Sequence, residues 1–205
     1  MTGTLTEERF KEQCEALVAF SDKINDGWEM RRDLDDIYIV KKVKLPVVFR
    51  DDNNKNPGVP ANTISVKEAE SDDDSSEDQI TLEDSDPCPF SPSSHLVTFE
   101  YHVVYSTSYT VPVLYFNAWF STGKLLTVEE VWKLAPPCSD RYSYITQIEH
   151  PILARPFYEL HPCRTEQLMG QMGSSEGDTY LVSWISSMGR DVGLSLDVRY
   201  AMSGT

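Results

Sequence analysis

A cysteine that directly follows a His-Pro step is the residue whose setting in this sequence best suits chemistry. Cys163 comes after His161 and Pro162, and an apolar run over residues 157–160 precedes them. Because proline lacks a backbone donor and restricts the residue before it, a strand is expected to end at this step. Residues 164–169 are predicted to form a short helix, so Cys163 would lie between a strand end and a helix N-terminus.

This predicted position favours the deprotonated, nucleophilic form of the Cys163 thiol. The backbone N–H groups at a helix N-terminus carry partial positive charge, and the neighbouring Arg164 adds a full charge. A thiolate on a rigid turn is suited to forming a covalent acyl intermediate. Free cysteines are also among the most buried residue types and often act as small hydrophobes, so the local sequence by itself leaves a packing role open.

The other three cysteines are predicted to be packing or loop residues. Cys14 lies on the apolar face of an N-terminal helix, Cys88 lies between two prolines, and Cys138 follows two prolines. None forms a Cys-x-x-Cys pair or has metal-ligand spacing with the four histidines, so no metal or other cofactor is expected. Without a signal-peptide pattern or an apolar run of roughly 18 residues, we expect a cytoplasmic protein with free thiols and no transmembrane segment.

Negative charge dominates the composition and is unevenly distributed. The formal net charge is −15 at pH 7, and nine acidic residues lie between Glu70 and Asp86, a stretch without Lys or Arg. Nucleic acid and anionic membrane surfaces would repel such a chain. Residues 51–94 are rich in Asn, Asp, Ser, Pro and Gly and contain few apolar residues, which predicts a disordered acidic insertion.

The remaining pattern predicts helices packed against a mostly antiparallel sheet. Thr4 and Glu7 fit a capping box for a helix that extends to about Asn25, and Thr127 and Glu130 fit a second one. Residue periodicity predicts strands at 28–32, at 37–48 with one face in solvent, at 95–105, at 109–120 with both faces buried, and before Cys163, and then a helix at 179–188. The predicted fold class is α+β, in a single domain spanning residues 1–205.

Aromatic side chains are concentrated on the two long strands of the second half. A base-stacking platform would also carry basic residues, which are scarce here, so these rings are expected to pack in the core. The residues concerned are Tyr101, Tyr105, Tyr109, Tyr115, Phe116 and Trp119.

Two parts of the chain resemble the autophagy ubiquitin-like-conjugating enzymes. They are residues 149–165, which contain the His-Pro-Cys step, and the aromatic strands at 101–105 and 109–116. The step is also similar to the active-site step of a related enzyme, autophagy-related protein three. The resemblance extends from the N-terminal helix to about Tyr200 and is weakest in the acidic middle. It implies the ubiquitin-conjugating-enzyme fold, in which an antiparallel sheet with flanking helices supports an active-site cysteine after the last strand.

The resemblance also implies an acyltransferase that works through a thioester. An activating enzyme, autophagy-related protein seven, would pass the C-terminal glycine of a ubiquitin-like modifier, autophagy-related protein twelve, to Cys163. The modifier would then be joined to a lysine of the acceptor, autophagy-related protein five. This chemistry suits a thiol, which attacks readily and leaves readily. It needs no metal, and ATP is consumed by the activating enzyme.

Cys163 is the one residue to which a catalytic role is assigned. His161 would share a strand face with it and either bias the thiol toward thiolate or shape the turn, while Glu149 and His150 would approach from the preceding loop. Conventional ubiquitin-conjugating enzymes carry a His-Pro-Asn step whose Asn is the oxyanion donor. Here Ile152 follows the earlier His-Pro step, so the donor is unassigned.

Two other classes of function stay open. The first is a cysteine hydrolase in which Cys163 pairs with His102, His150 or His161, although the papain-type and caspase-type signatures are absent. The second is a non-catalytic module of the same fold that docks proteins on its sheet. A conjugating enzyme, unlike either of these, requires the activating enzyme to load its cysteine.

Overall fold

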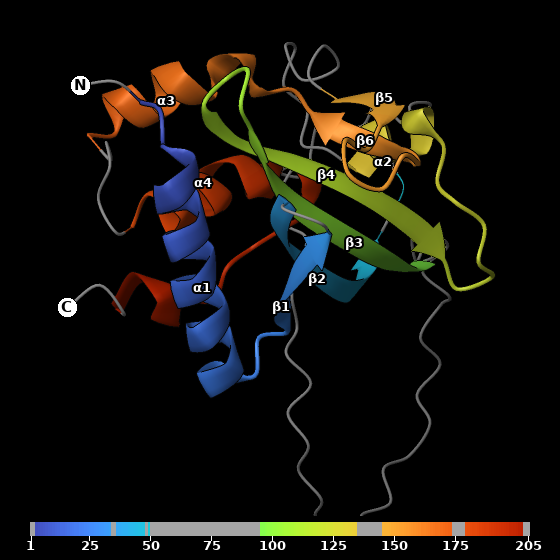
Figure 1. Cartoon of the computed structure of the whole chain (residues 1–205). Coiled ribbons are helices and arrows are strands. Elements are labelled where there is room, and N and C mark those ends of the chain that lie inside the picture. Colours follow the sequence, from blue (N-terminus) through green and yellow to red (C-terminus); the bar gives the residue numbers. More distant parts are fainter. Residues whose placement is uncertain are drawn as a thin grey trace, which may run out of the picture.

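The computed structural model describes residues 3–33, 36–47, 49, 95–134, 145–173 and 179–202. The predicted disordered insertion at 51–94, together with Cys88 and Cys138, lies outside the described residues. The described elements build one antiparallel sheet with helices against it (Figure 1), which confirms the predicted α+β class.

The sheet contains six strands in the order β1-β2-β3-β4-β6-β5, and each neighbouring pair is antiparallel. Its strands are β1 (Trp28–Asp33), β2 (Asp36–Val47), β3 (His95–Ser106), β4 (Val111–Phe120), β5 (Ile145–Glu149) and β6 (Pro156–Leu160). The α-helices are α1 (Glu7–Ile24), α2 (Val128–Leu134), α3 (Thr165–Gln171) and α4 (Tyr180–Met188). Short 3₁₀ turns are η2 (Pro162–Arg164), η3 (Gly189–Val192) and η4 (Val198–Met202).

The start of α1 differs from the prediction. Thr6, rather than Thr4, is the N-cap, and its hydroxyl accepts a hydrogen bond from the backbone N–H of Arg9 at 3.3 Å. Leu5 is drawn away from the helix because it is buried and its N–H donates to the carbonyl of Thr110 at 2.9 Å. The capping box predicted at Thr4 was therefore wrong. The capping box predicted at Thr127 and Glu130 was correct, since the N–H of Thr127 donates to the Glu130 carboxylate at 2.7 Å.

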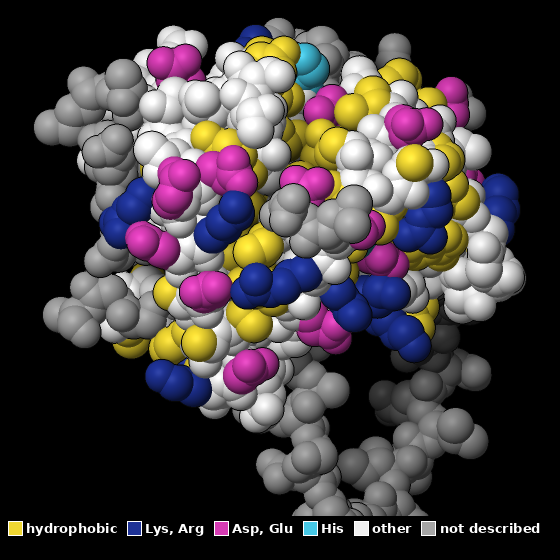
Figure 2. Space-filling view, in the orientation of Figure 1, with side chains coloured by type: hydrophobic (Ala, Val, Ile, Leu, Met, Phe, Trp, Pro, Cys, Tyr) yellow, Lys and Arg dark blue, Asp and Glu magenta, His cyan; other side chains and the backbone are white. Residues whose placement is uncertain are grey.

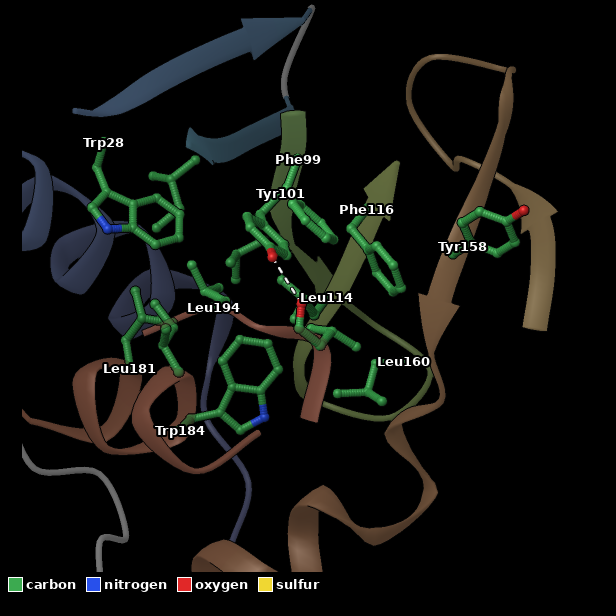
Figure 3. Packing of buried hydrophobic residues seen from close by; sticks show 14 of the residues in the cluster. Trp28, Phe99, Tyr101, Leu114, Phe116, Tyr158, Leu160, Leu181, Trp184 and Leu194 are labelled. Carbon is green, nitrogen blue, oxygen red and sulfur yellow. Dashed lines mark hydrogen bonds between the residues drawn. The ribbon is translucent and has the colours of Figure 1, made fainter. Parts of the chain in front are cut away.

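The main core lies between the sheet and the helices α1 and α4. Large side chains from both ends of the chain meet there, as the close view in Figure 3 shows for Trp28 and Trp184. Tyr101 is fully buried in this core, and its hydroxyl donates to the backbone carbonyl of Val192 at 2.8 Å, drawn as the dashed line in Figure 3. This bond ties the centre of β3 to the C-terminal turns.

A second apolar cluster covers part of the opposite face of the sheet. It contains Tyr38, Val40, Val104, Val113, Tyr115 and Phe157, with Ile152 and Leu153 of the β5–β6 loop packed on it. The prediction that β2 has one face in solvent was therefore wrong at Tyr38 and Val40, because a loop more than 100 residues further along the chain covers them. Lys41, on the helix side, is also buried and pairs with Asp26 at 2.6 Å.

Strand β5 was not predicted, although it forms the edge of the sheet beside β6. The predicted burial of both faces of β4 is confirmed from Val111 to Ala118. Pro112, which lacks a ladder donor, pairs with Tyr105 of β3 and lies outside the stretch from Leu114 to Phe116 that pairs with β6. The proline is tolerated because no β6 carbonyl faces it.

We expect Tyr101→Phe to lower the free energy of unfolding by about 1–3 kcal/mol, because the buried carbonyl of Val192 would lose its donor. Urea unfolding followed by circular dichroism measures the change. The control is Tyr109→Phe. Because Tyr109 is 46% exposed, this change should alter the free energy of unfolding by less than about 0.5 kcal/mol. Equal effects of the two changes would contradict the proposed role of the Tyr101 hydroxyl.

Candidate active site

Cys163 lies on the turn that joins β6 to α3, as the sequence predicted. The strand ends at Leu160, His161 caps the 3₁₀ turn η2, and α3 begins at Thr165. Of the two cysteines that the structure describes, Cys163 is exposed and Cys14 is buried in the core. The expected packing role of Cys14 is confirmed by its place in the core cluster, and burial raises the pKa of its thiol.

The elements on both sides of the cysteine are anchored in the core. Leu160 is buried and pairs with Leu114 of β4 on one side and with Ile145 of β5 on the other. After the turn, the side chains of Thr165 and Met169 anchor α3 because they are buried in the core. The Trp184 indole N–H also donates to the Thr165 hydroxyl at 3.5 Å. The exposed thiol is thus presented by a turn whose two ends are fixed.

His161 shapes this turn directly. Its Nδ1 atom accepts a hydrogen bond from the backbone N–H of Cys163 at 3.1 Å. This contact matches the turn-forming role considered from the sequence. The same N–H is thereby engaged, so the oxyanion donor stays unassigned.

Tyr109 packs on the His161 ring edge to face, with ring centroids 5.8 Å apart. Its expected core position was wrong, because Tyr109 belongs to the exposed β3–β4 turn rather than to a strand. The following residue, Thr110, has a positive φ of 52°, which is strained for a β-branched side chain. The sequence predicted a turn at 106–108 and a strand from Tyr109, so it began the strand inside the observed turn and missed the contact with His161.

A buried carboxylate lies on the strand just before the turn. Glu159 is 9% exposed and accepts a hydrogen bond from the Tyr115 hydroxyl at 3.3 Å. Burial raises the pKa of Glu159, while the nearby His161 partly opposes that shift. The local sequence did not single out this acidic residue.

The start of the described chain closes one side of the site. Residues 3–5, here called the N-terminal segment, run past α3 and the β3–β4 turn (Figure 1). Between this segment and α3 lies an open surface pocket of about 430 Å³, here called the Cys163 pocket. Its walls are formed by Gly3, Cys163, Glu166, Gln167, Gly170 and Gln171. No local pattern in the sequence indicated that residue 3 would contact residues more than 150 positions further on.

Comparison with known proteins places the chain in a family. Residues 9–198 match the family described as autophagocytosis associated protein, active-site domain. The chain belongs to the autophagy ubiquitin-like-conjugating enzymes. It is 33% identical to the human protein named ubiquitin-like-conjugating enzyme ATG10, over 95% of this chain and 91% of the human one. The Arabidopsis thaliana protein of the same name is 44% identical over 48% of this chain and 50% of its own.

The fold of this autophagy conjugating enzyme also matches a solved structure. A crystal structure titled as the autophagic E2, Atg10, superimposes with a TM-score of 0.51 at 15% identity, covering 93% of this chain and 98% of that one. The predicted ubiquitin-conjugating-enzyme-like fold is therefore confirmed. Within the described residues, no helix has the length and apolar character needed to cross a membrane.

Two other histidines considered for catalysis lie away from the cysteine turn of this conjugating enzyme. His102 and His150 are buried against each other, with Nδ1 of His102 and Nε2 of His150 3.1 Å apart. They pack among Tyr115 and Phe157 on the sheet face opposite the main core. Glu149 lies exposed on the edge strand β5. The expectation that Glu149 and His150 approach Cys163 is not supported by these positions.

The bonds of this histidine pair define a directed chain. Nδ1 of His150 accepts from the backbone N–H groups of Ile152 and Leu153 at 3.3 and 3.2 Å. Its Nε2–H must then donate to His102, whose other nitrogen donates to Glu100 at 2.8 Å. Burial, followed by the neighbouring His102, lowers the pKa of His150 to about 4. Neutral His150 therefore holds the β5–β6 loop on the second cluster.

This arrangement predicts a loss of stability in mild acid. His150 takes up a proton near pH 6.5 when unfolded but near pH 4 when folded, so its contribution is complete above pH 6.5 and declines as the pH falls toward 4. We expect the free energy of unfolding to fall by about 2–3 kcal/mol from pH 7 to pH 4.5 through this group. Urea titrations at the two pH values measure the effect.

The matched variant is His150→Asn, whose side-chain oxygen retains an acceptor for the loop but does not titrate. The stability difference between wild type and variant should shrink by the same 2–3 kcal/mol on acidification. A difference that is constant from pH 7 to pH 4.5 would show that His150 is not the titrating group.

Proposed function

We propose that this enzyme carries a ubiquitin-like modifier as a thioester on Cys163 and transfers it to a lysine of an acceptor protein. The observation that carries the proposal is the exposed thiol on an anchored His-Pro-Cys turn beside an open pocket, in a member of the autophagy conjugating family. Cys14 is unsuited to this role because it is buried.

The reaction requires two acyl transfers at one sulfur atom. The Cys163 thiolate attacks the C-terminal carbonyl carbon of the modifier, and the thiolate of the activating enzyme leaves. The lysine amine of the acceptor then attacks the new thioester, Cys163 leaves as thiolate, and the amine proton passes to solvent. A thiol serves both steps because it is a good nucleophile and a good leaving group.

The partners follow from the family resemblance. They are the activating enzyme autophagy-related protein seven, the modifier autophagy-related protein twelve and the acceptor autophagy-related protein five, meeting in the cytoplasm. Charged side chains of both signs are available for such contacts. Over α1 and β1, Lys and Arg side chains lie among Asp and Glu side chains (Figure 2), with Arg32 and Glu15 3.4 Å apart across the two elements.

The test of the proposal is a charging assay with purified chain, activating enzyme, modifier and ATP, analysed on a non-reducing gel. We expect a thiol-sensitive band at the summed mass that is absent in Cys163→Ala. Cys163→Ser should instead give a reductant-resistant ester, because the hydroxyl forms an oxygen ester. The control is Cys14→Ala, which should still be charged if it folds.

Each other result of the charging assay points to a different mechanism. If charged activating enzyme yields no band with the wild-type chain, conjugation is ruled out and the docking module becomes the better explanation. Partner binding that is unchanged in Cys163→Ser, with no charged band for either protein, would support the same module. A band that survives Cys163→Ala would move the nucleophile to another cysteine.

The role of His161 predicts a graded effect of two substitutions. His161→Ala removes the acceptor for the Cys163 N–H and should slow charging about tenfold, the loss expected for one hydrogen bond that fixes the reacting geometry. His161→Asn supplies a side-chain oxygen at a similar position and should retain most of the rate. Single-turnover charging measures both, and an equal loss in the two variants would contradict the turn-forming role.

A further inference from the structure

We infer that the N-terminal segment, residues 3–5, is a brace that holds the cysteine turn in its reactive position, a role that rests on the proposed thioester chemistry at Cys163. The segment contacts the two elements that flank this turn. One is α3, which follows the cysteine directly in the chain. The other is the β3–β4 turn, residues 107–110, which contacts the residue that caps the cysteine turn.

The contact with α3 is made by backbone on backbone. A Cβ atom added to Gly3 would overlap the carbonyl oxygen of Glu166 and lie 2.5 Å from the nitrogen of Gly170. Only glycine permits so close an approach. The Tyr180 hydroxyl fixes Gly3 in this place by donating to its carbonyl at 2.7 Å. The brace therefore restrains the helix that begins two residues after Cys163.

The contact with the β3–β4 turn is made by Leu5. Its N–H donates to the carbonyl of Thr110 at 2.9 Å, and its own carbonyl accepts from the Tyr105 hydroxyl at 2.8 Å. Thr110 has a φ of 52°, a conformation that is costly for a β-branched residue and persists only where the surroundings hold it. Because Leu5 is buried in the core, its hydrogen bond is a firm restraint on this strained residue.

The β3–β4 turn acts on the cysteine through two rings. Tyr109, the neighbour of Thr110, packs edge to face on His161, with ring centroids 5.8 Å apart and an interplanar angle of 79°. Nδ1 of His161 accepts the backbone N–H of Cys163 at 3.1 Å. A continuous series of contacts thus runs from Leu5 to the backbone of the cysteine.

Both sides of the cysteine turn are therefore restrained by one short segment from the other end of the described chain. Acyl transfer requires the sulfur to lie about 3–3.5 Å from the carbonyl carbon it attacks, and a shift of about 1 Å can slow a reaction about a hundredfold. Residues 3–5 and Tyr109 would act as positioning residues, since they reach the sulfur only through the turn.

The first test is Gly3→Ala, whose methyl group must move the segment off α3. We expect the maximal rate of single-turnover charging to fall about tenfold, because the turn loses one restraint. The concentration of charged activating enzyme that gives half this rate should not change. The matched control is Gly27→Ala at the opposite end of α1. It places alanine at a φ of 81° in open space, so it should lower stability and leave charging unchanged.

The second test compares Tyr109→Ala with Tyr109→Phe. The alanine variant removes the ring that packs on His161 and should slow charging about fivefold, the effect expected for one aromatic pair. The phenylalanine variant keeps the ring and should retain the wild-type rate. Because Tyr109 lies on the surface, both variants should stay folded, so this pair decides the question even if Gly3→Ala fails to fold.

Amide exchange followed by NMR gives a readout that needs no partner protein. In Gly3→Ala and Tyr109→Ala the Cys163 N–H should exchange about fivefold faster than in the wild type, because the turn opens more often. Gly27→Ala and Tyr109→Phe should exchange at the wild-type rate.

Wild-type charging and exchange in Tyr109→Ala and in folded Gly3→Ala would overturn the inference. So would a Gly3→Ala variant whose half-saturating concentration rises at an unchanged maximal rate, because the segment would then be a contact for the activating enzyme. Faster Cys163 exchange in the two variants, with no charging of the wild type, would support the brace and overturn the proposed function instead.

Discussion

The short ladder between β4 and β6 determines where Cys163 lies. In the described part of the chain, three residue pairs join these strands, from Leu114–Leu160 to Phe116–Tyr158. Leu160 also pairs with β5, so the strand before the turn is bonded on both sides. A slip of one residue would turn Tyr158 and Leu160 out of the main core. The packing of the helix side of the sheet therefore fixes the register that presents the cysteine.

The pocket beside the cysteine depends on contacts across nearly the whole chain. The hydrogen bond from Tyr180 to Gly3 joins residues 177 positions apart. Closing a loop of that length costs conformational entropy. Burial of Leu5 and Tyr180 in the core cluster, with Tyr105 packed against it, offsets this free-energy cost. The cysteine turn is formed by local residues, whereas its pocket exists only once both ends of the chain have packed.

The two faces of the sheet position the strand before Cys163 in different ways. The helix side supports the cysteine turn through Leu160, Thr165 and Trp184. The other side buries a neutral histidine pair that holds the β5–β6 loop. That loop leads into β6, so both faces act on the strand that ends at the cysteine. This is why a histidine that suggests catalysis in the sequence serves a structural purpose in the fold.

The sequence by itself determined the features that depend on local chemistry. Proline placement ended the strand at the His-Pro-Cys step, alternation of side chains located β3, and a continuous apolar run located β4. Tertiary structure decided which distant groups meet: Gly3 at α3, Tyr109 at His161, His150 at His102, and Thr6 rather than Thr4 as the helix cap. Periodicity reports which side of an element is apolar, a property of neighbouring residues. Which residues pack against that side depends on strand register and on whether the burial of apolar surface offsets the entropy cost of loop closure. No local pattern encodes either.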